Sequence, residues 1–151
     1  MNGYSQVVKL LTAAVMLGAI IGTAPVFGKE CYAPDTRAQE RAFSRAVTTD
    51  GGKVLWLGGQ TGSPQLNFEG QVRAIFDSLD KTIKANGGVG LKDIVTMTVF
   101  ITDARYGDKL TEIRKEIFKE CFPASALITV SGLAVPGLLI EIQGIAVVGS
   151  K

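Results

Sequence analysis

The residue whose type and setting most suggest chemistry is Glu141, in the strand predicted over 138–148. It shares one strand face with Gln143, and the other side chains on that face are apolar: Leu139, Ile145 and Val147. A carboxylate on an apolar face is costly unless it is paired, hydrogen-bonded or placed in a wet cleft. Two interpretations follow. Glu141 is either an edge carboxylate paired with a basic residue of a neighbouring chain or a proton-handling acid in an interface pocket.

Other catalytic chemistries find little support in the composition. The chain of 151 residues contains no histidine, which removes the commonest general base, the commonest zinc ligand and the usual partner of a serine or cysteine nucleophile. The 16 basic and 14 acidic residues form no basic cluster, so nucleic-acid binding is not expected. The sequence therefore predicts no metal, no cofactor and no nucleic-acid partner.

Cys31 and Cys121 are the only two cysteines of the chain. In an oxidising compartment they can pair, and such a bridge across a long loop would contribute about 4 kcal/mol in the chain-entropy model. The alternative is two unpaired thiols, one exposed and one packed. No CxxC spacing is present, so redox catalysis is not indicated.

A leader segment precedes the predicted domain. Residues 10–27 carry no charge, follow Lys9, and end in Val26-Phe27-Gly28, which is the pattern of a secretory signal peptide. The run also approaches the roughly 20 residues that span a bilayer. We therefore predict that residues 1–28 are a signal peptide or an N-terminal membrane anchor and that 29–151 form the domain. The domain is expected to be exported, either periplasmic or secreted, or else membrane-anchored by residues 10–27.

The periodicity of the remaining chain predicts an α+β fold in the order ββαβαββ. The predicted strands are 43–48, 53–57, 93–101, 126–130 and 138–148, with Asp50-Gly51-Gly52 as a hairpin turn and 58–62 as a glycine-rich bend. One helix is marked by apolar residues at three-and-four spacing from Phe68 to Ile83, with Asn67 and Gly87-Gly88 as its caps, and a second by Leu110, Ile113 and Ile117.

Two helices on one face of this sheet would leave its other face uncovered. The last predicted strand is nevertheless apolar on both sides. A second copy of the chain is the simplest cover for the second face, so the sequence predicts a homo-oligomer.

Five segments together resemble the RidA family, also called YjgF or the L-PSP endoribonuclease-like family. Residues 43–47 (FSRAV) resemble its PYSQAV segment, and 58–62 (GGQTG) its SGQIG segment. Residues 93–103 (DIVTMTVFITD) are similar to DVVKVTVFLTD, which is the most specific match. Residues 122–126 (FPASA) stand where the family has a PARS motif, and 140–146 (IEIQGIA) match VEIEAIA.

The resemblance implies a chorismate-mutase-like fold with two helices on one face of a mixed sheet, and a homotrimer with small-molecule clefts between subunits. It also implies enamine and imine deaminase activity, a hydrolysis. In those members an arginine grips the substrate carboxylate, a glutamate helps to position water, and tyrosine and asparagine side chains line the pocket.

This chain departs from that pattern at four of the five site positions. Ser125 stands at the arginine position, Phe43 at the tyrosine, Thr111 at the asparagine, and Gly58 at the serine of SGQ; only the glutamate is kept, as Glu141. A serine hydroxyl offers one neutral donor where a guanidinium offers a charged fork. Losing such contacts in a desolvated cleft costs about 2 to 5 kcal/mol. We therefore expect a pocket with little affinity for small organic acids.

Three basic residues, Arg45, Lys109 and Arg114, lie in neighbouring segments, although the sequence does not place them in the cleft. Three functional hypotheses follow. The first is an exported, trimeric small-molecule-binding protein whose imino-acid deaminase activity is weak or lost. The second is a deaminase for an imine without a carboxylate, with Glu141 as the acid. The third is a non-catalytic accessory subunit of a membrane complex.

Overall fold

The computed structural model describes residues 28–149, so the predicted leader, 1–28, lies almost entirely outside the described part. The strands are β1 (Lys29–Tyr32), β2 (Ala46–Thr49), β3 (Lys53–Thr61), β4 (Ile94–Ile101), β5 (Ala124–Thr129) and β6 (Ile140–Val148). The helices are α1 (Thr36–Glu40), α2 (Phe68–Ala85) and α3 (Gly107–Phe118), with short 3-10 turns at Leu91–Asp93 and Ala104–Tyr106. Within residues 28–149 no helix has the length and apolar character to cross a bilayer.

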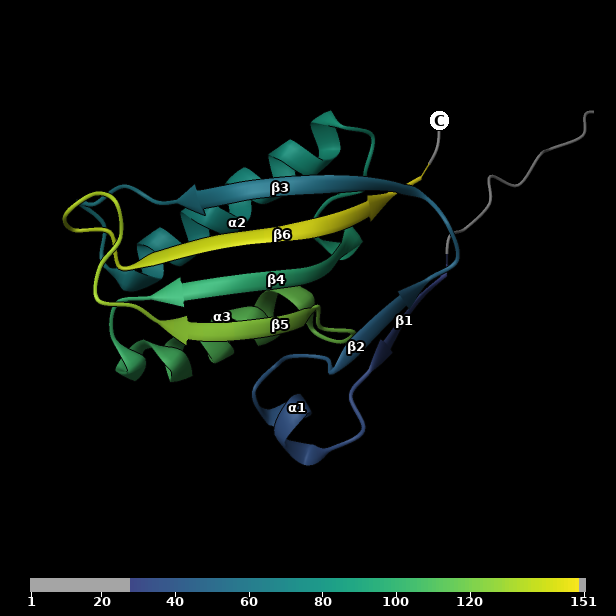
Figure 1. The fold of residues 1–151 in the computed structure, drawn as a ribbon, viewed down its shortest axis with the longest axis horizontal. Helices are drawn as coiled ribbons and strands as arrows, with labels where there is room; N and C mark the ends of the chain where they lie inside the picture. Colours follow the sequence, from purple (N-terminus) through teal and green to yellow (C-terminus); the bar gives the residue numbers. More distant parts are fainter. Residues whose placement is uncertain (1–27, 150–151) are drawn as a thin grey trace, which may run out of the picture.

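Four strands form the main sheet in the order β3-β6-β4-β5, and α2 and α3 cover one of its faces (Figure 1). The β3–β6 and β4–β6 pairs are antiparallel, whereas β4 and β5 run parallel. The predicted α+β class, the mixed sheet and the placement of these two helices on one face are confirmed. The β1 strand and α1 were not predicted.

The apolar stripe predicted for the first long helix forms the core. Val72, Ile75 and Ile83 of α2 are fully buried, as are Ile140 and Ile142 of β6. The helix has the predicted caps. Its N-cap side chain, Asn67, accepts a hydrogen bond from the Gly70 amide at 2.8 Å, and the Gly88 amide donates to the Ile83 carbonyl at 3.0 Å.

Two predictions about glycine-rich segments are wrong. Gly51 and Gly52 do adopt positive φ angles, of 91° and 103°, but they do not close a hairpin. The β2 strand pairs with β1 in a separate two-stranded sheet, and β3 pairs with β6, so the turn passes the chain from one sheet to the other. Sequence alone cannot separate these cases, because a tight turn is needed in both.

The predicted bend at 58–62 is instead mostly a continuation of β3, which runs to Thr61 with a bulge between Leu57 and Gln60. The glycine at position 59 allows close approach of a neighbouring side chain rather than a turn. A Cβ atom on Gly59 would overlap the carboxylate of Glu141 on the neighbouring strand.

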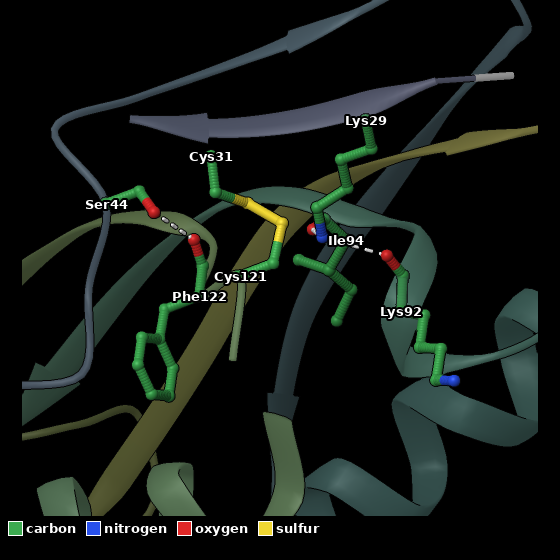
Figure 2. The surroundings of a disulfide bond; sticks show 7 residues. All are labelled: Lys29, Cys31, Ser44, Lys92, Ile94, Cys121 and Phe122. Atoms are coloured by element: carbon green, nitrogen blue, oxygen red, sulfur yellow. Dashed lines mark hydrogen bonds between the residues drawn. A yellow bond between two sulfur atoms is a disulfide. The ribbon is translucent and has the colours of Figure 1, made fainter. Parts of the chain in front are cut away.

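Residues 29–49, which contain β1, α1 and β2, form what we call the N-terminal arm, and it lies beside the β5 edge of the sheet (Figure 1). A disulfide joins Cys31 of β1 to Cys121 just before β5, with a Cα–Cα distance of 5.2 Å (Figure 2). On one side of it the Ser44 hydroxyl donates to the Phe122 carbonyl, and on the other the Lys29 ammonium donates to the carbonyls of Lys92 and Ile94. The arm is therefore fastened to the domain at three points.

Breaking the disulfide should destabilise the protein, because the bridge closes a loop with a sequence separation of 90 residues. We predict that the double variant Cys31→Ser/Cys121→Ser loses about 2 to 4 kcal/mol of unfolding free energy in denaturant titrations. A reducing agent should shift the wild type to a similar midpoint and leave the variant unchanged. Equal midpoints for wild type and variant under oxidising conditions would contradict the structural role of the bridge.

Candidate functional site: an arginine-lined pocket

A pocket of about 540 Å³ opens between the N-terminal arm and the α3–β5 edge of the domain. Its size falls within the range of small-molecule sites. The lining residues are Arg37, Arg41, Phe43, Arg45, Leu110, Thr111, Arg114, Ser125 and Leu127. The first four come from the arm and the other five from α3 and β5, so the pocket exists only while the arm is docked.

The domain wall of the pocket follows from helix and strand spacing. Thr111 and Arg114 are three residues apart on α3 and therefore share one face of the helix. Ser125 and Leu127 alternate along β5 and point to the face of the sheet that carries α3. The Thr111 hydroxyl donates to the Gly107 carbonyl at 2.9 Å, which fixes it within its own helix.

Arg114 is the central group of the site. Its side chain is only 3% exposed, and its Nη2 donates to the Ser125 hydroxyl at 2.7 Å. Among the described residues its Nε has no hydrogen-bond partner and its guanidinium no carboxylate. Burial, and next the positive charge of Arg41, lower the pKa of Arg114 to about 10, so the group remains charged at neutral pH. A buried cation without a counterion is costly, and an anion in the pocket would offset that cost.

The arginines of the arm are held differently. Arg45 pairs with Asp35 at 3.0 Å and lies over the Phe43 ring, 5.3 Å from its centroid. Asp35 also caps α1 by accepting from the Ala38 amide, and this bond, followed by Arg45, lowers the pKa of the Asp35 carboxyl. The Asp35 carboxylate thus both caps α1 and pairs with Arg45 in the arm wall.

Arg41 and Arg37 complete the arm wall. Arg41 pairs with Asp108 at the start of α3, at 2.5 Å, which adds a fourth link between arm and domain. Arg37 has no carboxylate within ion-pair distance in the part of the chain that the structure describes.

The sequence predicts little affinity for organic acids because position 125 lacks a guanidinium. That affinity stays a prediction, but the structure places another guanidinium next to position 125. Ser125 accepts a hydrogen bond from Arg114, so a cation stands beside the substituted position, supplied by α3 instead of β5. Of the other two basic residues considered from the sequence, Arg45 lines the pocket, whereas Lys109 pairs with Glu112 and does not.

The five predicted site residues fall into two groups. Phe43, Thr111 and Ser125 line the arginine pocket. Glu141 and Gly58 do not, since β6 and β3 place them away from it within one chain. Glu141 is half-buried opposite Thr61, on the sheet face that turns away from α2 and α3.

Arg37 and Arg41 were not among the sequence candidates. A signal for them was present, because Arg37, Arg41 and Arg45 recur at intervals of four residues. Such spacing in a polar segment usually indicates a solvated helix face. Only the docking of the arm against α3 turns these residues into a pocket wall.

The arrangement defines a class: a small α+β domain with a four-stranded mixed sheet, two helices on one face and an edge pocket rich in arginine. The family model described as Endoribonuclease L-PSP matches residues 33–148, and the chain belongs to this family, the RidA/YjgF family.

Relatives agree with this assignment. The RutC family protein YjgH of Escherichia coli is 35% identical over 115 residues, which cover 71% of this chain and 83% of that protein. A human 2-iminobutanoate/2-iminopropanoate deaminase is 31% identical over 114 residues, covering 71% and 80%. A solved structure of the Rid protein YyfB from Yersinia pestis superposes with a TM-score of 0.70 at 21% identity, covering 80% and 98%, and supports the fold.

The contact between positions 114 and 125 can be tested by exchange. We predict that Ser125→Arg alone lowers the unfolding free energy by about 1 to 3 kcal/mol, because it crowds a second guanidinium against the buried Arg114. Adding Arg114→Ser should recover most of that loss, which a double-mutant cycle measures as a coupling energy. Strictly additive effects would contradict direct contact between the two side chains.

Proposed function

We propose that this protein is a RidA-type binder of small organic acids and that the arginine-lined pocket is its ligand site. The observation that carries the proposal is the buried guanidinium of Arg114, which has no counterion among the described residues. An arginine in a water-poor pocket offers a charged fork matched to a carboxylate. The compounds in the name of the human deaminase are themselves carboxylic acids, which supports the same ligand class.

The proposal includes a homotrimer with the pockets between subunits. The physical support for a trimer is the sheet face opposite α2 and α3, which we call the open face. Trp56 and Val54 of β3 and Ile128 of β5 lie on it, with side chains 76%, 49% and 42% exposed. A monomer rarely leaves so much apolar surface on one face. Glu141 lies on this face, so a neighbouring subunit is the means by which its carboxylate would reach an arginine-lined pocket.

The proposal also places the protein outside the cytoplasm. The uncharged run at 10–27 is the pattern of an export leader, and the Cys31–Cys121 disulfide is a bond that persists in oxidising compartments.

Imine hydrolysis is a second candidate function, favoured by the position of Arg114 beside Ser125. In that reaction water adds to the imine carbon, the carbon–nitrogen bond breaks, and ammonia and a keto acid leave, with Glu141 of a neighbouring copy handling the proton. We propose that this activity is weak, because Phe43 offers no hydroxyl at the tyrosine position.

The ligand proposal is tested with 2-oxobutanoate, a stable keto acid, in calorimetric titrations of the intact protein. Arg114→Gln should weaken binding at least about tenfold, because it removes the buried charge that the carboxylate neutralises. Arg105→Gln is the matched control, since Arg105 is an exposed arginine outside the pocket and pairs with Asp103. Unchanged affinity in Arg114→Gln would overturn the proposal. Ammonia release from freshly generated 2-iminobutanoate, compared in wild type and Glu141→Gln, measures the second candidate.

The trimer is tested on the open face. Trp56→Glu should shift the sedimentation of the protein from trimer to monomer, because it places a charge in the proposed interface. Val89→Glu is the matched control, since Val89 is 72% exposed but lies in the loop after α2. A wild type that sediments as a monomer at all concentrations would contradict the trimer.

A further inference from the structure

Around the arginine pocket, positively charged side chains outnumber carboxylates by two. Its lining contains four arginines and no carboxylate. Asp35 and Asp108, from just outside the lining, pair with Arg45 and Arg41. Arg37 of the arm and Arg114 of α3 form no ion pair among the described residues. Arg114 is buried, whereas Arg37 is exposed and its charge also helps to lower the pKa of the Asp35 carboxyl.

Arg37 and Arg114 lie on the two walls of the pocket, the arm and α3, and the arm is linked covalently to the loop before β5. The disulfide fastens Cys31, six residues before Arg37, to Cys121, four residues before Ser125 (Figure 2). The Ser44 hydroxyl and amide add two bonds to the same loop, to the carbonyls of Phe122 and Pro123. The two walls are thus held together around a cavity of about 540 Å³, with the buried Arg114 on one wall and the exposed side chain of Arg37 on the other.

We propose that the ligand of this pocket is dianionic: a small organic acid with one acidic group bound by Arg114 and a second bound by Arg37. The inference rests on the proposed function, which assigns an organic acid to the pocket, and adds a second anionic group. That group can be a carboxylate or a phosphate, since both match the fork of a guanidinium.

Repulsion within the pocket favours the same conclusion. Arg41 lies close enough to Arg114 to lower its pKa, and the Asp108 carboxylate that pairs with Arg41 is largely exposed, so solvent screens that ion pair. A monoanion on Arg114 would leave a surplus positive charge on the arm wall. A second anionic group on the ligand offsets that surplus as well, and preorganisation of the walls keeps the ordering cost low.

The probes are glutarate, its monoanionic counterpart pentanoate, and 3-phosphonopropanoate, titrated calorimetrically into the oxidised full chain. We expect both two-charge acids to bind about tenfold more tightly than pentanoate. Arg37→Gln should weaken glutarate and 3-phosphonopropanoate about tenfold and weaken pentanoate much less. Arg114→Gln should weaken all three, and Arg105→Gln should change none. A preference of glutarate over the phosphonate, or the reverse, identifies the second group.

The outcomes distinguish a failure of the dianionic-ligand inference from a failure of the proposed organic-acid site. Equal affinities for glutarate and pentanoate, or insensitivity of glutarate to Arg37→Gln, would overturn the dianionic ligand and leave the organic-acid site standing. No binding of any probe would overturn both. In a trimer, Glu141 of a neighbouring subunit is a second source of negative charge for the pocket. The variant Glu141→Gln controls for this source. A glutarate preference that arises only in that variant would also overturn the inference.

Discussion

The buried contact between the Arg114 guanidinium and the Ser125 hydroxyl is the interaction on which the account of this site depends. It places a charged group in a protein wall without a carboxylate to balance it among the described residues. Stability alone does not favour such a group, because an apolar side chain of similar volume would avoid the desolvation cost. The cost has a functional reason if an anion binds there, and the surrounding arginines point to the same kind of ligand.

The pocket depends equally on the N-terminal arm. This segment, with only one short helix and two short strands, contributes little to the main core, whose buried residues come largely from α2, β4, β6 and α3. It is instead attached through a disulfide, hydrogen bonds to backbone carbonyls and the Arg41–Asp108 ion pair. A segment attached in this way can carry a polar, charged wall that a hydrophobic interface could not accommodate.

Much of the fold could be predicted from the sequence because its signals are local. The apolar stripe of α2, the Asn67 cap and the two-sided apolar character of β6 each follow from a few neighbouring residues, and the structure contains all three. Strand partners are non-local, which is why the sequence predicts a hairpin at Asp50-Gly51-Gly52 although β2 pairs with β1. The prediction of a bend at 58–62 is wrong for a similar reason, since Gly59 lies against the side chain of Glu141 on another strand.

The candidate site was predicted only in part. The resemblance to RidA proteins identified Phe43, Thr111 and Ser125, which do share a pocket. It did not reveal that the Arg114 guanidinium lies beside position 125, because residues 11 apart in sequence meet only when α3 packs against β5. Nor did it reveal the arm wall, since Arg37 and Arg41 acquire their role from the docking of the arm. An arginine that is absent from one strand position can thus have a counterpart on a neighbouring helix.

The most direct test of the account is the NMR signal of the Arg114 Nε–H group in protein labelled with nitrogen-15 at arginine. Arg114→Lys assigns the resonance by its disappearance. We expect saturable titration with 2-oxobutanoate to move this resonance more than that of any arginine outside the pocket, because the carboxylate neutralises the buried guanidinium. A ligand that binds while the Arg114 resonance stays in place would contradict the central claim that this guanidinium is the anion-binding group.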